Sequence, residues 1–237
     1  MKQNISVLRL FARSSFPAFA VIVALGAAVQ FLLFRGALQP GMLASAVADQ
    51  SHISLVFLVM FLLTTVLLIL PGSAFSTHTE YTVRRLGMSE TRYFILQALY
   101  NAGVYFILLA SELFITLGLI AYFKAHAAPS LWGPQEAVMT FYRSPFLHAL
   151  LPMADWGKTL ANILAVLSLG TLAALYPREK REGRNPVLIF VAALFTCITF
   201  RQRMGQSYTA VFLAAGLVVM AAASTILSFS EEGNQDA

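Results

Sequence analysis

Long runs of apolar residues constrain this chain more than any other feature. A helix needs roughly 20 apolar residues to cross the ~30 Å hydrocarbon core of a bilayer. Four runs meet this length, at 16–34, 53–70, 93–123 and 208–229. A further run, Leu160–Tyr176, is shorter but uncharged. The last, Val187–Phe200, has only about 14 apolar residues before Arg201, a length that also fits a re-entrant or interfacial segment. We therefore expect an all-α integral membrane protein with one transmembrane domain (1–237) and six transmembrane helices, at 16–34, 53–70, 93–123, 158–176, 187–200 and 208–229.

The composition agrees with a surface that faces lipid. Of 237 residues, 58% are hydrophobic and only 11% are charged, whereas soluble domains carry about 25% charged residues. The net charge of +5 arises from short basic clusters between the apolar runs, where they meet anionic lipid headgroups. Membrane lipids are thus the expected partners, and nucleic acid is not. The single cysteine, Cys197, excludes an intramolecular disulfide.

Basic residues gather in alternate connections. Three precede the first run, and three separate the second from the third. Since basic connections stay on the cytoplasmic side, this pattern predicts a multi-pass protein with both termini in the cytoplasm. Arg201 and Arg203, on the outer side, are an exception to the pattern. The basic residues in order are Lys2, Arg9 and Arg13, then Arg84, Arg85 and Arg92, then Arg178, Lys180, Arg181 and Arg184.

The first 14 residues favour an amphipathic elbow helix. At about 100° per residue, Lys2, Arg9 and Arg13 share one face, and apolar residues such as Phe11 occupy the other. Such a helix lies in the inner interface, and Pro17 would allow a bend into the first span. The alternative is a helical extension of that span, with its arginines reaching back to headgroups.

Two segments are expected outside the spans. The outer loop 124–157 contains four prolines and several aromatic residues, which predicts one or two short helices at the outer membrane face. The acidic tail 230–237 follows the last span. His126 and His148 lie in the outer loop but share no helix-face motif with other ligands, so no metal site is expected.

Glu112 is the one acidic residue well inside an apolar run. Carboxylates in the membrane usually face the bundle interior and mark substrate or ion paths. Glu112 is thus a candidate for a transport path. The alternative is a structural role, in which its carboxyl is neutral or hydrogen-bonded to a neighbouring helix.

The connection between the second and third runs is too polar to span and too rich in helix formers to be a plain loop. It predicts a short helix over 82–87 and a new helix start at Ser89. By composition alone this is a passive basic loop. Its sequence EYTVRRLGMSETRYFILQALYN, however, resembles the corresponding segment in permeases of the type-2 ABC exporter family.

The resemblance implies a function. It would make this segment a coupling helix that docks on a separate ATPase, and the connection after the fourth span (Arg178, Lys180, Arg181 and Arg184) a second cytoplasmic contact. The chain would be the permease subunit of an exporter of hydrophobic or amphipathic substrates in a bacterial cytoplasmic membrane, paired with a second copy or a homologous permease. The implied docking residues are Thr82, Val83, Arg84, Arg85, Leu86, Gly87, Met88 and Ser89.

Energy and chemistry would come from elsewhere. The chain has no GxxxxGK[ST] phosphate-binding motif, so ATP and Mg²⁺ would be bound by the partner ATPase and no cofactor by this chain. An ATP-independent carrier or a substrate-binding membrane component is the alternative. An intramembrane enzyme is disfavoured, because no nucleophile and base stand at a recognisable spacing.

Overall fold

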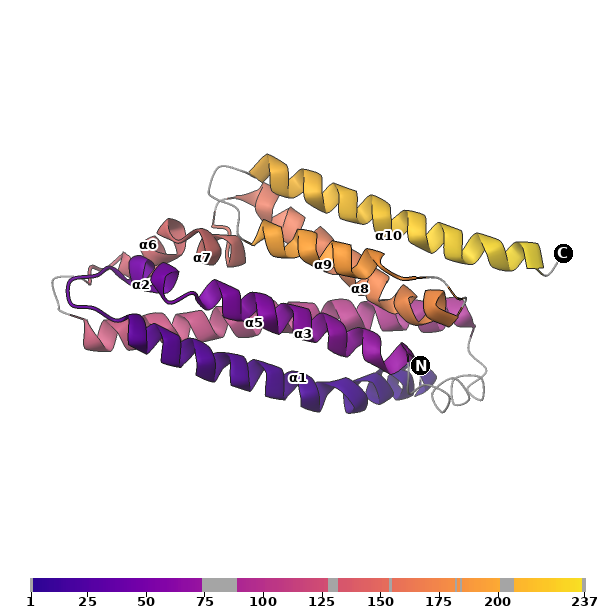
Figure 1. Cartoon of the computed structure of the whole chain (residues 1–237), viewed down its shortest axis with the longest axis horizontal. Coiled ribbons are helices and arrows are strands. Elements are labelled where there is room, and N and C mark those ends of the chain that lie inside the picture. Colours follow the sequence, from indigo (N-terminus) through magenta and orange to yellow (C-terminus); the bar gives the residue numbers. More distant parts are fainter. Residues whose placement is uncertain are drawn as a thin grey trace.

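The computed structural model describes residues 2–73, 89–127, 132–153, 155–181, 183, 185–200 and 207–235, and every regular element in these ranges is an α-helix (Figure 1). Among the described helices, five are long and apolar enough to cross a membrane, as expected of an all-helical, multi-pass membrane protein. They are α1 (Lys2–Ala37), α3 (Ile53–Ser73), α5 (Glu90–His126), α8 (Trp156–Arg181) and α10 (Ser207–Gln235). The shorter helices are α2 (Ala44–Gln50), α6 (Glu136–Arg143), α7 (Pro145–Leu150) and α9 (Leu188–Thr199).

The outward faces of the long helices are apolar. On α1, Val21, Leu25 and Leu32 are each more than half exposed, and α10 exposes Phe212 and Val219 in the same way. Soluble monomers rarely expose such large continuous apolar surfaces. Lipid is the environment in which these side chains are stable.

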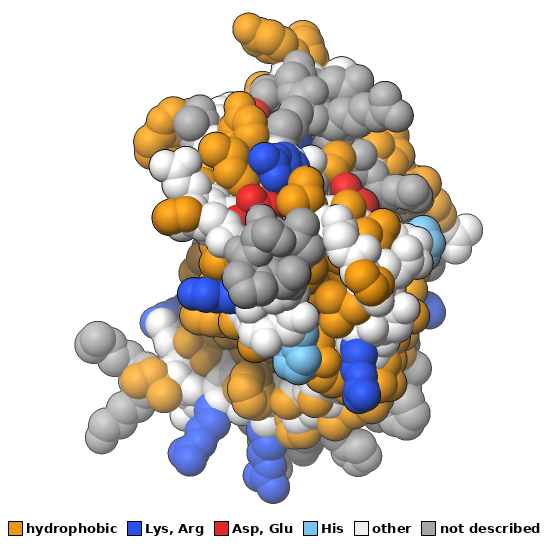
Figure 2. Space-filling view, turned by 90° about the vertical axis from the view of Figure 1, so that its left-hand side faces the viewer, with side chains coloured by type: hydrophobic (Ala, Val, Ile, Leu, Met, Phe, Trp, Pro, Cys, Tyr) orange, Lys and Arg blue, Asp and Glu red, His pale blue; other side chains and the backbone are white. Residues whose placement is uncertain are grey.

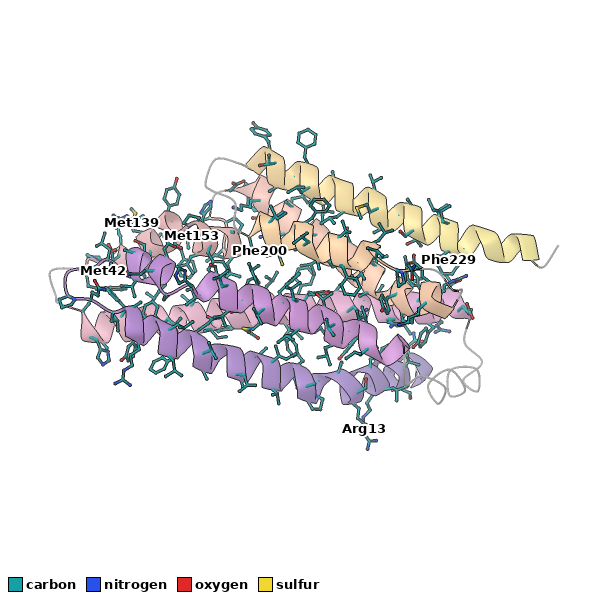
Figure 3. All side chains as sticks on the ribbon, in the orientation of Figure 1. Arg13, Met42, Met139, Met153, Phe200 and Phe229 are labelled. Atoms are coloured by element: carbon teal, nitrogen blue, oxygen red, sulfur yellow. The ribbon has the colours of Figure 1, made fainter. Side chains whose placement is uncertain are left out.

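The predicted elbow is not a separate element. α1 runs as one helix of 36 residues through Pro17, a length of about 54 Å. Its first turns pack along α5, where the Phe11 ring lies 5.5 Å from that of Tyr93. Arg13 points away from the bundle (Figure 3). This arrangement corresponds to the alternative interpretation, a helical extension of the first span.

Side-chain contacts fix the directions of α1 and α5. The Ser15 and Tyr100 hydroxyls lie 2.6 Å apart near the start of both helices. Further along, Gln30 of α1 contacts Glu112 of α5. The two helices are therefore parallel, and α3 returns between them in the sequence.

α8 and α10 are also parallel. Near their starts, Ala161 packs with Ala210 and Ala214. Near their ends, Arg178 Nη2 donates a hydrogen bond to the Ser228 carbonyl. The chain between them must therefore travel back along the bundle, and α9, with 12 residues, lies in this returning segment. Figure 1 accordingly shows both chain termini at the same end of the bundle, which we call the terminal end.

The close packing of α8 on α5 depends on Gly170. A Cβ at this position would lie 2.8 Å from the Ala102 nitrogen and 2.9 Å from the Ala98 carbonyl oxygen. Small residues that let helix backbones approach in this way are typical of membrane interfaces. Phe200, which follows α9, also points into the interior (Figure 3) and lies 5.2 Å from the Phe57 ring of α3.

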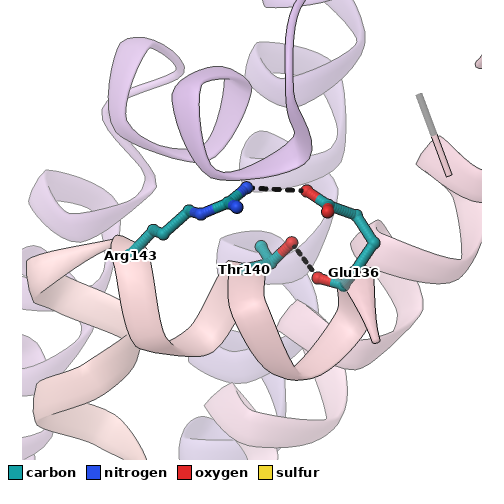
Figure 4. A network of polar contacts seen from close by, with 3 residues as sticks. All are labelled: Glu136, Thr140 and Arg143. Carbon is teal, nitrogen blue, oxygen red and sulfur yellow. Dashed lines mark hydrogen bonds and ion pairs between the residues drawn. The ribbon is translucent and has the colours of Figure 1, made fainter. Parts of the chain in front are cut away.

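The opposite end, which we call the cap end, is covered by α2, α6 and α7. Ser144 Oγ donates to Asp49 at 2.6 Å and so joins the α6–α7 junction to α2. Within α6, Arg143 pairs with Glu136 (Figure 4). Figure 2 looks onto this end and shows acidic and basic side chains among hydrophobic ones. The described part of the 124–157 loop thus contains the end of α5, two short helices and the start of α8, and α10 extends through most of the expected acidic tail, to Gln235.

Candidate functional site

Most of the predicted coupling helix, Thr82–Met88, lies outside the described residues. Ser89 is described and is the N-cap residue of α5, with extended backbone angles of φ −65° and ψ 144°. Its side chain makes no capping hydrogen bond. The predicted helix start at Ser89 is therefore confirmed, and docking by this segment stays a prediction.

Arg178 connects three helices at the terminal end. Its Nη1 lies 3.8 Å from Glu90 Oε2 in the first turn of α5. Its Nη2 donates to the Ser228 carbonyl of α10 at 2.8 Å, and its guanidinium lies 4.2 Å from the centre of the Phe229 ring. The Phe94 ring packs on Phe229 at 5.5 Å. We call this cluster the Arg178 clamp. The Arg178 side chain is only 11% exposed.

Lys180, which belongs to the second predicted contact, has an exposed side chain. Its ammonium lies 5.8 Å from the Tyr176 ring centre. With Asn185 and Phe190 it lines a pocket of about 390 Å³ where α8 passes into the link to α9. Arg181 is the last residue of α8, and Arg184 lies outside the described residues. The two side chains described at this contact therefore differ, because the Arg178 guanidinium is engaged within the chain and the Lys180 ammonium is exposed.

Glu112 is fully buried between α1, α3 and α5, with no exposed surface. Gln30, also fully buried, donates from Nε2 to Glu112 Oε2 at 2.9 Å. No cation lies within ion-pair distance of this carboxyl in the described part of the chain. An ionised carboxylate without a cation is very unfavourable in an apolar medium. The polar side chain that contacts this carboxyl is the amide of Gln30.

Two oxygens of this pair have no partner among the described residues. Glu112 Oε1 and Gln30 Oε1 are both buried and accept no hydrogen bond from that part of the chain. Buried polar atoms are satisfied in the large majority of cases. Two orphaned acceptors on adjoining groups therefore mark this pair as a candidate binding site.

α3 completes the surroundings of the pair. Gln30 Nε2 also contacts Met60 Sδ at 3.7 Å. Met60 can reach this position because residue 26 is glycine, where a Cβ would lie only 2.1 Å from the sulfur. The nearby Thr116 hydroxyl is already used, since it donates to the carbonyl of Glu112 in its own helix at 3.0 Å.

A second polar cluster lies at the cap end around His148. This side chain is buried and its ring packs on Tyr142 at 5.6 Å. Its Nδ1 has no hydrogen-bond partner among the residues that the structure describes. Burial and the Lys158 ammonium hold the pKa of His148 below its ordinary value of 6.5, against the opposing effect of Asp155. Burial likewise raises the pKa of Asp49 above its ordinary value of 3.8, although the hydrogen bond from Ser144 lowers it. Among the described residues, no three His, Cys, Asp or Glu side chains are grouped to hold a metal ion.

The sequence singled out Glu112 but not its partner Gln30. A signal was present, because Gln30 is the only amide side chain in the apolar run 16–34. The sequence also identified Arg178 only as part of a basic cluster. Nothing in the local pattern showed that its guanidinium would turn inward to Glu90 and the end of α10.

In comparisons with known proteins, no family model, no curated protein and no solved structure matches this chain.

Proposed function

We propose that this chain is the membrane-spanning permease subunit of a transporter energised by a separate ATPase. In this proposal it crosses the membrane six times, with α9 and its flanking residues as the fifth crossing in order. Its substrate is hydrophobic or amphipathic, and it works with a second copy of itself or a similar permease. ATP and Mg²⁺ are bound by the ATPase subunits.

The parallel directions of α8 and α10 support six crossings. α9 spans about 18 Å at 1.5 Å per residue, which is shorter than the ~30 Å hydrocarbon core, so residues on either side of it complete the crossing. The terminal end holds Arg9, Arg13 and Arg92 together with the Arg178 clamp. Basic residues favour the cytoplasmic side, and we place this end there.

The Arg178 clamp is the observation that carries the proposal. The predicted coupling helix, Thr82–Ser89, leads directly into the first turn of α5. Arg178 ties Glu90 in that turn to the ends of α8 and α10. A partner that pulls on the segment would therefore act on the first turn of α5, which contacts α8 and α10 through Glu90 and Phe94.

Docking by this segment is testable on the intact complex. We expect the triple variant R84A/R85A/L86A to lose the ATPase that co-purifies with the wild-type chain in mild detergent. The matched control replaces two exposed basic residues at the cap end, Arg35 and Lys124, with alanine, and should retain the ATPase. An ATPase retained equally by both variants would refute the docking assignment.

Accessibility labelling tests the orientation. In a Cys197→Ser background, which removes the only native thiol, Ser89→Cys should react with a membrane-impermeant thiol reagent only after the cells are opened. Trp132→Cys should react in intact cells. The reverse pattern would overturn the proposed topology.

The buried Glu112–Gln30 pair favours a second candidate, an ATP-independent carrier. Polar side chains within a membrane often mark an ion or substrate path, and this path would need no partner. Reconstitution separates the two functions. Uptake into vesicles that contain the purified chain alone would favour the carrier, and uptake that requires the ATPase and ATP would favour the permease subunit.

A further inference from the structure

Glu112 and Gln30 present complementary but incomplete hydrogen-bonding groups. One side of the pair is satisfied, because Gln30 Nε2 donates to Glu112 Oε2 at 2.9 Å. The other side brings two acceptors and no donor, since Glu112 Oε1 and Gln30 Oε1 are both buried and unpartnered. A missing donor explains both orphaned oxygens at once.

A proton supplies that donor more simply than a metal ion. Ca²⁺ takes six to eight oxygen ligands and Mg²⁺ about six, whereas this site has two free oxygens. The Thr116 hydroxyl, which lies one turn along α5, already donates to backbone carbonyls. The Thr64 hydroxyl, one turn beyond Met60, donates to the Met60 carbonyl. Neither hydroxyl proton is therefore available to the two free oxygens, so an added proton is the donor that fits this site.

We propose that the Glu112–Gln30 pair is an intramembrane proton-binding site. A proton taken from water forms an O–H bond at Glu112 Oε1 and is donated to Gln30 Oε1. The carboxyl and the amide then form a closed pair with two hydrogen bonds, one in each direction. Release returns the proton to water and leaves a carboxylate held by the Gln30 N–H alone.

In the described part of the chain, no charged group near the pair competes for this role. α3 has no Asp, Glu, His, Lys or Arg. On α1 the nearest ionisable group is Arg35, which is exposed, and on α5 the Tyr105 hydroxyl donates to Thr65. α8 has its charged residues only towards its two ends, at Lys158 and at Arg178, Glu179, Lys180 and Arg181. His148 on α7 belongs to the cap end, where its ring packs on Tyr142.

The proposed site depends on the hydrogen-bonding geometry of this pair, and proton binding there requires no ATPase. Under the permease proposal it would lie in the transport path, and under the carrier alternative it would name the coupled ion. A spectroscopic test reads proton binding directly. Its failure is therefore distinct from failure of the ATPase-docking experiment.

Infrared spectroscopy of the purified full-length chain in lipid nanodiscs tests the site. The wild type should show a carbonyl stretching band of a protonated carboxyl at neutral pH, which disappears on alkalinisation. The band should be absent in Glu112→Gln, which keeps two amides able to pair and so preserves folding. Glu136→Gln, which alters an exposed ion pair on α6, should leave the band unchanged.

Variants of Gln30 provide the second readout. Gln30→Leu removes the acceptor, so the band should move to higher frequency as the carboxyl loses its hydrogen bonds. The exchange variant Q30E/E112Q restores one acid and one amide and should recover the wild-type frequency. A wild-type spectrum without a band that Glu112→Gln removes, or a band unmoved by Gln30→Leu, would overturn the proposal. Amide bands recorded from the same samples establish that each variant is folded.

Discussion

Replacing Gly170 by alanine tests the packing of α8 on α5. The new Cβ would lie 2.8 Å from the Ala102 nitrogen, 2.9 Å from the Ala102 Cβ and 2.9 Å from the Ala98 oxygen. Ordinary contacts of this kind begin near 3.4 Å. Two of the three atoms belong to the backbone, so no side-chain rotation relieves the overlap. The two helices must separate along their shared seam.

The magnitude follows from three contributions. Overpacking a well-packed interior costs about 1–3 kcal/mol, and backbone contacts place Gly170→Ala at the upper end. The hydrogen bond from Asn101 Nδ2 to the Gly170 carbonyl, already long at 3.4 Å, would also be lost, and such bonds in membranes contribute about 0.6 kcal/mol. Alanine gains about 1 kcal/mol in helix propensity over glycine. The net loss is therefore about 2–3 kcal/mol.

Gly103→Ala is the matched control. This glycine lies on α5 beside Ala102, and a Cβ there has nothing within 4 Å. It receives the same gain in propensity without the overlap, so the difference in unfolding free energy between the two variants should be about 3–4 kcal/mol. Unfolding by SDS in mixed micelles, followed by circular dichroism, measures it.

Equal stability of Gly170→Ala and Gly103→Ala would refute this account of the α5–α8 seam. A double variant, A102G/G170A, removes one of the three overlaps and should recover part of the loss. Neighbouring residues are expected to couple in this way. If Gly170→Ala alone yields no folded protein, the unfolding free energy is measured on the double variant instead.

Two further outcomes concern the ends of the bundle. Arg178→Leu removes a charged hydrogen bond and a ring contact and should lower the unfolding free energy by about 1.5–3 kcal/mol. Lys180→Ala, at an exposed site, should change it by less than about 0.5 kcal/mol. Equal effects of the two variants in the same SDS titration would show that the Arg178 clamp does not stabilise the bundle. Because the pKa of His148 is lowered in the folded protein, the unfolded chain binds more protons below pH 6.5, and thermal stability should fall as pH drops through that value. His148→Gln should flatten this pH dependence, and an unchanged slope would contradict the assignment.

The sequence predicted the long helices well, because hydrophobic length is a local property. The apolar runs 53–70 and 93–123 correspond closely to α3 and α5. Charge alternation alone did not establish the helix directions. These follow from contacts between distant residues, such as Ser15 with Tyr100 and Ala161 with Ala214.

Other features depended on tertiary packing and were not predictable from local pattern. The basic face of residues 1–14 indicated an interfacial elbow, yet Phe11 finds Tyr93 and Tyr100 on α5 and the helix continues unbroken. Glu112 was identified because a carboxyl is conspicuous in an apolar run. Its partner is 82 residues away in the sequence, a separation that no local pattern reveals.

The shortness of α9 bears on how the protein enters the membrane. A 12-residue apolar helix is too short to cross the hydrocarbon core on its own, because a spanning helix needs about 20 apolar residues. Its inner face is nevertheless buried, with Ala192 and Ala193 at 0% and 1% exposure. In the proposed topology the contacts of α9 with the neighbouring helices therefore hold it in the bilayer. The two ends of the chain lie on the same side of the membrane only if α9 and its flanking residues complete this crossing.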